Sequence, residues 1–357
     1  MYSILELVLA FIIAGVVSLG TTPLYRRLAF KINAIDQPDE RKKHEGTKAY
    51  LGGLAIITGV IAGLLYLQPS HPHMTAILIG GAIIIVTGLL DDLLTLKPYQ
   101  KLIGQIASAA IVMWSGLLIN AITIPFVGTV QLEGFAYVIT FFWIIGVTNA
   151  INLIDGLDGL AAGVSSIGLT SILIMAVMDA QWVVVYLATI LVASCLGFLY
   201  HNFYPAKIFM GDTGALFLGY SIAIISMLGL FKNVALFSFI IPIIVIAVPI
   251  LDTVFAIIRR VINKQSIGTP DRKHIHYQLI DLGFSHRSAV LIIYLFSAFF
   301  GIMAILFSSA TMLASLIVFV AVLIAIQIIA ELTGVVLKGR RPLINRLQRL
   351  IDKKQNL

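Results

Sequence analysis

The sequence predicts an all-α integral membrane protein with about eleven transmembrane helices, its N-terminus outside the cell and its C-terminus in the cytoplasm. Composition is the first observation: 59% of the 357 residues are hydrophobic and 11% are charged, whereas soluble domains carry about 25% charged residues. The second is a series of apolar stretches close to the roughly 20 residues that span a bilayer as a helix. The third is the distribution of lysine and arginine, which indicates a topology. We expect one polytopic membrane domain over residues 1–357.

The candidate spans follow one another along the chain. They lie near residues 3–23, 51–68, 75–90, 102–119, 135–153, 160–178, 182–200, 214–231, 234–258, 288–308 and 312–335. The first carries Glu6 and has no basic region before its apolar run, so we interpret it as a retained helix and not as a signal peptide. The outer segment 120–134 has the pattern of a short β-hairpin. Because Cys195 is the single cysteine, an intrachain disulfide framework is excluded.

The basic residues determine the predicted orientation. Every lysine and arginine except Lys232 falls in alternate connections or in the C-terminal tail, as expected for the cytoplasmic side. The basic cytoplasmic tail, residues 338–357, suits attraction to anionic lipid headgroups. The net charge of +7 therefore points to the membrane surface, and we predict no nucleic-acid partner. Gly59 and Gly63 permit close helix packing within one chain or between two copies, which leaves a homodimer open.

Two adjacent acids, Asp91 and Asp92, end the third span in TGLLDDLLTL. Carboxylates at a helix C-terminus repel each other and are disfavoured by the helix dipole, and they are costly next to lipid. A cation is therefore expected to offset them. A solvated helix end would explain them too, but we interpret the pair as part of a metal or catalytic site.

Polar residues also extend from the fifth span, where TNAINLIDGLDGLAAG places Asn149, Asn152, Asp155 and Asp158 three residues apart. If the helix continues, these side chains lie on one slowly drifting face. Such a polar stripe in an apolar bundle suits a polar ligand. Hydrogen bonding between helices is the alternative interpretation.

The connection after the seventh span, HNFYPAKIFMGDTGALFLGY, places Asn202 and Asp212 in a short loop. Glycines on both sides of a single acid allow backbone amides to approach phosphate oxygens while the acid holds a cation. The motif is predicted to lie on the same cytoplasmic side as the two preceding ones.

The longest cytoplasmic loop, residues 259–287, contains GTPDRKHIHYQL. Its cationic cluster, which includes Arg272, His274 and His276, suits contacts to phosphate or sugar hydroxyls and has too few ligands for a zinc site. A solvated loop is the alternative. We interpret Asp252, two turns before the Arg259–Arg260 pair, as a structural partner of those arginines, and a catalytic role is the alternative.

Five motifs in this order, LGG, TGLLDD, NAINLIDGLDGLAAG, HNFYPAKIFMGDTGALFLG and HIHY, resemble the polyprenyl-phosphate N-acetylhexosamine-1-phosphate transferases, which include MraY, WecA and TagO. The resemblance covers nearly the whole chain and is closest to the TagO and WecA branch. It implies a multi-pass enzyme of the bacterial plasma membrane with its active site facing the cytoplasm. The implied reaction transfers N-acetylglucosamine 1-phosphate from UDP-N-acetylglucosamine (UDP-GlcNAc) to undecaprenyl phosphate, releases UMP and begins the synthesis of a cell-wall glycopolymer such as teichoic acid.

The resemblance also implies Mg²⁺ as the cofactor, with Mn²⁺ as a substitute, and it assigns the site residues. Catalytic roles are implied for Asp91, Asp92, Asp212, His274 and His276, and metal binding for Asp212 and Asn152. Substrate contacts are implied for Lys48, Lys101, Asn152, Asp155, Asp158, Asn202, Phe209 and Arg272. The histidine motif departs from the HxHH pattern of many WecA-like members, because Tyr277 stands in the fourth position.

Two alternatives remain. The first is the same chemistry on UDP-N-acetylmuramoyl-pentapeptide, as in MraY. The second is a lipid-linked sugar transporter, although transporters usually place polar groups near the bilayer midplane on broken helices. For the transfer itself we favour direct displacement, because a phosphate monoester with a second pKa of about 6 is mostly dianionic and hardly needs a general base. A phospho-aspartate intermediate is the competing route.

Overall fold

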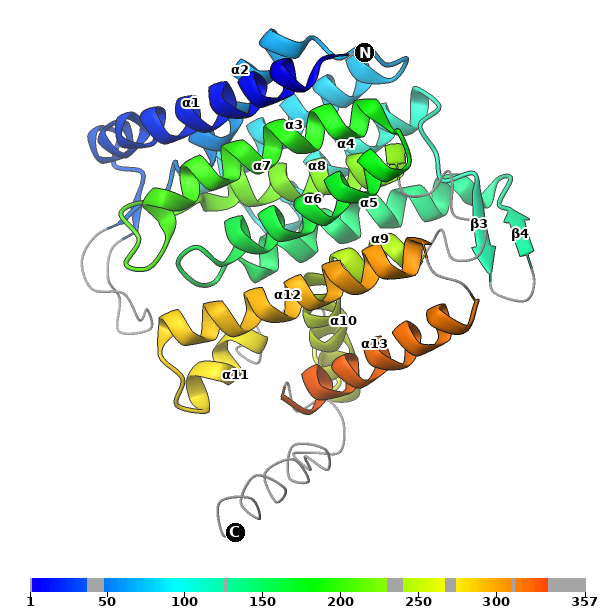
Figure 1. Cartoon of the computed structure of the whole chain (residues 1–357). Helices are drawn as coiled ribbons and strands as arrows, with labels where there is room; N and C mark the ends of the chain where they lie inside the picture. Colours follow the sequence, from blue (N-terminus) through cyan, green and yellow to red (C-terminus); the bar gives the residue numbers. More distant parts are fainter. Residues whose placement is uncertain are drawn as a thin grey trace, which may run out of the picture.

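The computed structural model describes residues 2–36, 48–124, 128–229, 240–266, 274–309 and 312–332. Its long helices lie side by side in a bundle (Figure 1). The strands within these ranges form two short antiparallel pairs: β1 (Ile35–Asp36) with β2 (Lys48–Ala49), and β3 (Ala121–Ile124) with β4 (Gly128–Gln131). The predicted all-α class is confirmed, and the β3–β4 pair is the hairpin that the sequence indicated in segment 120–134.

Eight helices in the described ranges are long and apolar enough to cross a membrane. They are α1 (Ile4–Lys31), α3 (Met74–Leu94), α5 (Phe135–Ile154), α6 (Leu160–Met178), α7 (Trp182–Asn202), α8 (Gly211–Gly229), α12 (His286–Ser309) and α13 (Met312–Leu332). Three further predicted spans correspond to shorter helices: α2 (Gly53–Leu67), α4 (Pro98–Trp114) and the α9–α10 region. A count of about eleven crossings and the orientation of the termini therefore stay predictions.

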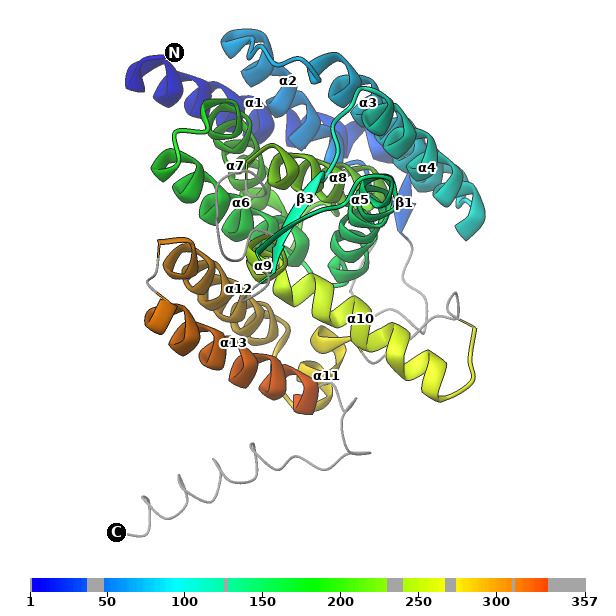
Figure 2. The same cartoon turned by 90° about the vertical axis from the view of Figure 1, so that its right-hand side faces the viewer.

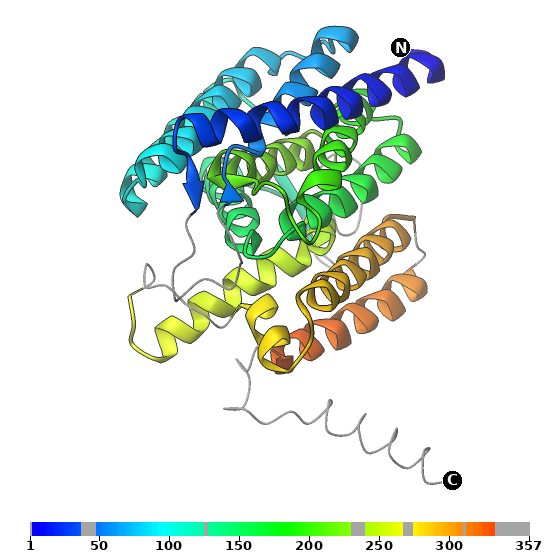
Figure 3. The ribbon, with the colours of Figure 1, turned by 90° about the vertical axis from the view of Figure 1, so that its left-hand side faces the viewer.

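The predicted ninth span, residues 234–258, is not a single helix in its described part. It is divided into α9 (Ile240–Val245) and α10 (Ala247–Ile262). Pro249 explains the break, because proline has no N–H to donate to the carbonyl of Val245, four residues earlier, and its ring clashes with that carbonyl. Beyond the break, α10 leads away from the bundle (Figures 2 and 3). The sequence prediction of one continuous helix was wrong here.

The centre of the bundle is α8, in which every residue from Thr213 to Gly229 is buried. It packs against α3 and α5, and glycines allow the backbones to approach closely. A Cβ at Gly88 of α3 would lie 2.5 Å from the Cα of Thr213, and one at Gly219 would lie 2.7 Å from the Cα of Thr148 on α5. This packing brings the start of α8 next to the ends of α3 and α5.

Helices α1, α2 and α7 pack together on one side of α8. A Cβ at Gly59 would lie 2.6 Å from the carbonyl oxygen of Ala14, and one at Gly63 would lie 2.7 Å from Ile190. The small residues of α2 thus serve packing within this chain, and homodimerisation stays an untested prediction.

The two ends of the bundle differ. The β3–β4 hairpin lies at one end, with Ile122 opposite Val130, and α11 (Ile275–Asp281) lies at the other (Figure 1). The ends of α3 and α5 and the start of α8 all carry motifs that the sequence singled out. They meet at the end of the bundle opposite the hairpin.

Candidate active site

The two acids at the end of α3 have different partners, because adjacent residues on a helix point about 100° apart. Asp91 is 6% exposed. Its carboxylate accepts a hydrogen bond from the backbone N–H of Leu96 at 2.7 Å and forms an ion pair with Lys101. Asp92 turns toward the first turn of α8. The acids that the sequence grouped as one pair therefore perform two separate tasks.

Asp92 binds the N-terminus of α8. Its Oδ1 accepts from the backbone N–H of Asp212 at 2.7 Å, and its Oδ2 accepts from the backbone N–H and the hydroxyl of Thr213 at 3.0 and 2.5 Å. The first N–H groups of a helix have no partner inside it and form the positive end of its dipole. Gly211, whose φ is +75°, leads the chain into this turn. Asp92 thus determines where α8 begins, and with it the position of Asp212.

We expect Asp92→Ala to destabilise the protein by about 3 kcal/mol, because hydrogen bonds to a charged group contribute about 1.5–3 kcal/mol each and the donors of α8 would lose their acceptor. Thermal unfolding of the purified protein in detergent should show a lower midpoint. Asp92→Asn keeps one acceptor oxygen, so its unfolding midpoint should fall by less. Equal midpoints for the wild type and Asp92→Ala would contradict this assignment.

Lys101 joins the acids of α3 and α8. It lies in the first turn of α4, which begins at Pro98, a residue favoured at this position. Its ammonium forms an ion pair with Asp91 and lies 3.3 Å from Oδ1 of Asp212. The same Asp212 oxygen accepts a hydrogen bond from the side-chain amide of Asn152, on the last turn of α5. Four elements thus contribute one residue each to a compact acid, amide and lysine cluster.

A pair of side-chain amides holds α4 against α5 one turn deeper in the bundle. Asn149 Nδ2 donates to Gln105 Oε1 at 2.7 Å, and Gln105 Nε2 donates to Asn149 Oδ1 at 3.3 Å. Gln105 is 2% exposed and follows Lys101 by four residues, so both side chains lie on one face of α4. The first residue of the predicted polar stripe, Asn149, is therefore a link between helices, as the alternative interpretation proposed.

The stripe does not continue as a helix, because α5 ends at Ile154 and α6 begins at Leu160. Gly159, with a φ of +78°, makes the turn into α6. Asp155 follows the end of α5. Enclosure by protein, and then the negative charges of Asp212 and Asp92, raise the pKa of Asp155 to about 8. Its carboxyl therefore holds its proton to a higher pH than a free carboxyl does.

The connection between α5 and α6 is held by bonds from three other elements. Asp158 Oδ2 accepts from the backbone N–H of Ala206 at 2.8 Å, and the Asp158 N–H donates to Nε2 of His286 at 3.0 Å. Asn202 Oδ1 accepts from the Gly159 N–H at 3.1 Å. The hydroxyl of Tyr294 donates to the Gly159 carbonyl at 2.5 Å. Asp158 and Asn202 therefore anchor this connection, and their predicted substrate contacts stay predictions.

The LGG motif positions the loop that precedes Asp212. The Gly52 N–H donates to the Phe209 carbonyl at 3.0 Å, and the Gly53 N–H donates to the Met210 carbonyl at 2.7 Å. A Cβ at Gly53 would lie 2.2 Å from the backbone nitrogen of Gly214, so a side chain there would separate the two segments. Next to them, the ammonium of Lys48 donates to the carbonyl of Ala206.

The histidine motif forms the start of α11. His274 Nδ1 lies 2.8 Å from Oδ2 of Asp252, and the Ile275 N–H donates to Oδ1 of the same carboxylate at 2.9 Å. His276 is 1% exposed, and burial lowers its pKa to about 4. A Cβ at Gly156 would lie 2.3 Å from Nε2 of His276, so this ring reaches the α5–α6 connection.

The structure therefore places the residues that the sequence predicted in three groups. One cluster contains Asp91, Lys101, Asn152 and Asp212, with Asp92 and Asp155 at its border. A supporting group consists of Lys48 of β2, Asp158, Asn202 at the end of α7, and Phe209. His274 and His276 belong to α11, and Arg272 lies outside the described residues. The sequence analysis missed the roles of Gln105, Thr213, His286 and Tyr294. Each is a polar side chain within or beside an apolar run, and this pattern could have indicated them.

The donors of this cluster suit a hard cation. Mg²⁺ usually takes one or two carboxylates together with waters and phosphate oxygens. Among the described residues no three His, Cys, Asp or Glu side chains form a preassembled metal cage. Asp212, whose side chain is 31% exposed, can still offer a carboxylate oxygen. The site therefore fits a magnesium ion that is bound partly by the phosphate oxygens of a substrate. It fits an ion that is bound by protein side chains alone less well.

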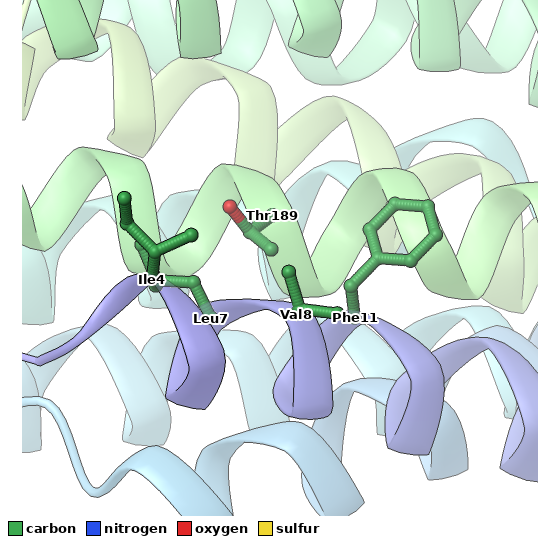
Figure 4. A pocket seen from close by; sticks show the side chains of 5 residues that line it. All are labelled: Ile4, Leu7, Val8, Phe11 and Thr189. Carbon is green, nitrogen blue, oxygen red and sulfur yellow. The ribbon is translucent and has the colours of Figure 1, made fainter.

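A second surface feature is separate from this cluster. A shallow groove between α1 and α7 is lined by Ile4, Leu7, Val8, Phe11 and Thr189 (Figure 4). Its lining contains no titratable side chain. It lies along the first turns of α1, whereas the acids lie where α3 and α5 end. The groove is therefore an apolar surface suited to lipid contact and offers no group for catalysis.

Comparison with known proteins finds a family and several relatives. A model of the family described as "Glycosyl transferase family 4" matches residues 74–230, which include every acid of the cluster. The chain is 48% identical, over 98% of both chains, to a Bacillus subtilis (strain 168) protein named probable undecaprenyl-phosphate N-acetylglucosaminyl 1-phosphate transferase. It is 36% identical, over 81% of both chains, to the decaprenyl-phosphate N-acetylglucosaminephosphotransferase of Mycobacterium leprae. It is 28% identical, over 76% of both, to the undecaprenyl-phosphate alpha-N-acetylglucosaminyl 1-phosphate transferase of Escherichia coli K12.

Proposed function

The chain belongs to glycosyl transferase family 4, the polyprenyl-phosphate N-acetylhexosamine-1-phosphate transferases, and from this we propose that it transfers N-acetylglucosamine 1-phosphate from UDP-GlcNAc to undecaprenyl phosphate. The reaction releases UMP and initiates a cell-wall glycopolymer such as teichoic acid. It takes place at the cytoplasmic face of the bacterial plasma membrane. The names of the relatives support N-acetylglucosamine 1-phosphate as the transferred group and a polyprenyl phosphate as the acceptor. The polar motifs support the position of the site at the helix ends.

One observation carries the proposal: the cluster of Asp91, Lys101, Asn152 and Asp212 at the end of an otherwise apolar bundle. A soluble nucleotide sugar and a membrane lipid can meet only at the membrane surface, where these helix ends lie according to the predicted topology. The cluster offers both a carboxylate for a metal ion and a cation for phosphate.

We propose that Mg²⁺, for which Mn²⁺ can substitute, is held by Asp212 with help from the amide of Asn152. When bound, the ion would offset the negative charge of the pyrophosphate. Lys101, whose ammonium lies 3.3 Å from Oδ1 of Asp212, would contact phosphate oxygens. Asp155, which directly follows α5, is proposed to contact the nucleotide sugar. His274, His276 and Arg272 are the groups proposed for phosphate and sugar contacts.

In the proposed step an oxygen of undecaprenyl phosphate attacks the β-phosphorus of UDP-GlcNAc. A new P–O bond forms to the lipid phosphate, the bond to the bridging oxygen of UMP breaks, and UMP leaves with that electron pair. The protein contributes mainly orientation and charge, as in other phosphoryl transfers. Asp92, whose carboxylate accepts the N–H groups of α8, supports the site in this scheme.

The test is UMP release by the purified enzyme in mixed micelles containing undecaprenyl phosphate. We expect UMP from UDP-GlcNAc and none above background from UDP-N-acetylmuramoyl-pentapeptide or when the lipid is omitted. Release from the pentapeptide substrate alone would replace the proposal with the MraY-like reaction. Movement of a lipid-linked sugar across the liposome membrane without release of UMP would favour the transporter instead.

The same preparation tests the route of transfer. Direct displacement predicts that labelled UMP exchanges into UDP-GlcNAc only when the lipid product is present. Exchange in lipid-free enzyme would instead favour the phospho-aspartate route, because a covalent intermediate could form from the nucleotide sugar alone.

A further inference from the structure

The Asp252–His274 pair is the most enclosed acid–histidine contact in the described part of the chain. Asp252 is 1% exposed and His274 is 5% exposed. Both oxygens of the carboxylate are used: Oδ2 is 2.8 Å from His274 Nδ1, and Oδ1 accepts the Ile275 N–H at 2.9 Å. A buried carboxylate on an apolar helix is costly unless its partners are arranged for it. Two directed bonds to α11 satisfy that requirement.

We propose that Asp252 is a positioning residue for the transferase reaction, which holds His274 in the tautomer with the proton on Nδ1 and turns its Nε2 away from α10. An ionised carboxylate only accepts hydrogen bonds, so Nδ1 must donate. The partner of one ring nitrogen sets the role of the other, as for carboxylate–histidine pairs in many sites. Nε2 of His274 is then the ring position that can contact a ligand.

The same carboxylate also positions the second histidine. By binding the Ile275 N–H, Asp252 fixes the first residue of α11. The rings of His274 and His276 are parallel, with centroids 5.9 Å apart and an interplanar angle of 5°. His276 has no hydrogen-bond partner for either ring nitrogen in the described structure, although it is buried, and it faces Gly156 beside Asp155. One acid on α10 therefore sets the placement of both rings relative to the α5–α6 connection.

A purely structural role would also explain a buried acid that ties α10 to α11. The structural role and the positioning role require different hydrogen bonds from the two carboxylate oxygens of Asp252. A structural tie needs mainly the bond from Oδ1 to the backbone, whereas the positioning role also needs Oδ2 as an acceptor for His274. Asp252→Asn separates them, because its amide oxygen can keep the Ile275 bond while its NH₂ group faces Nδ1 and forces the proton onto Nε2.

We expect Asp252→Asn to lower kcat by about 10- to 100-fold, the range typical of partners that orient a functional histidine, with little change in the KM for UDP-GlcNAc. In ¹⁵N spectra of histidine-labelled protein in bilayers, the protonated nitrogen of His274 should move from Nδ1 to Nε2. The His274 signal among the 7 histidines is assigned by its loss in His274→Gln. The adjacent Thr253→Val, which removes a buried hydroxyl without a hydrogen-bond partner, is the matched control and should keep wild-type kcat.

A double variant completes the test. If Asp252 acts through His274, Asp252→Asn should cost no further activity in a His274→Gln background; an additional loss of the same size there would overturn the proposal. An unchanged His274 tautomer in Asp252→Asn would overturn it as well. The catalytic part rests on the proposed function, but the tautomer is measured without substrate. Absence of UMP release from the wild type would therefore refute the transferase assignment, whereas the spectra decide the role of Asp252.

Discussion

Asp212→Asn is expected to lower kcat by about 1,000-fold or more while leaving the fold intact. A metal ion that offsets charge on a phosphoryl group contributes several kcal/mol to the transition state, and each 1.36 kcal/mol corresponds to a factor of about ten in rate. The substitution removes the partly exposed carboxylate of the cluster. It leaves the backbone N–H of residue 212, which donates to Asp92, in place. The start of α8 should therefore keep its position.

The measurement is UMP release as a function of Mg²⁺ concentration, together with the midpoint of thermal unfolding. Asp179→Asn is the matched control, because this exposed acid follows the far end of α6 and should keep both wild-type kcat and wild-type Mg²⁺ dependence. If Asp212→Asn retained magnesium-dependent turnover close to that of the wild type, Asp212 would not be the metal ligand. Loss of activity in Asp179→Asn would show that charge removal in general is harmful.

Most of the membrane helices could be predicted from the sequence because an apolar run of sufficient length has one stable structure in a bilayer. The end of α5 at Ile154 and the start of α6 at Leu160 also agree with the predicted spans 135–153 and 160–178. The partners of the residues between these helices could not be predicted, because they lie far along the chain, on α7, on α12 and in the loop before α8. Pro249, by contrast, was a local signal for the division between α9 and α10 that hydropathy concealed.

The different tasks of Asp91 and Asp92 show why site residues are easier to find than to assign. Two adjacent acids at the end of an apolar helix are energetically costly, and this indicates that they have a function. Which acid meets Lys101 and which meets α8 depends on the rotation of α3, and Gly88 sets this by allowing α8 to approach. The partner of His274 was likewise hidden, because Asp252 lies 22 residues earlier in the chain.

The role of Lys101 in the cluster leads to the second large effect. Lys101→Met is expected to lower kcat/KM for UDP-GlcNAc by about 100-fold. The methionine keeps much of the side-chain length but removes the ammonium shared by Asp91 and Asp212. A hydrogen bond to a charged group contributes about 1.5–3 kcal/mol, and each 1.36 kcal/mol corresponds to a factor of about ten in rate, so the loss of the ammonium's contacts with the pyrophosphate corresponds to roughly 100-fold.

Steady-state kinetics of UMP release measure this effect, with Lys97→Met as the matched control: Lys97 is exposed and precedes Pro98 at the start of the same helix. If Lys101 contacts the pyrophosphate, the KM for UDP-GlcNAc should rise as kcat falls, and Lys101→Arg should restore part of the binding because it keeps a cation. A loss confined to kcat, with no recovery in Lys101→Arg, would mean that Lys101 acts by holding the Asp91 and Asp212 carboxylates in place. Wild-type kinetics in Lys101→Met would exclude both a phosphate contact and a positioning role for Lys101. Without the ammonium, the negative charges of Asp91 and Asp212 should repel phosphate and so change the kinetics if the substrate binds next to them.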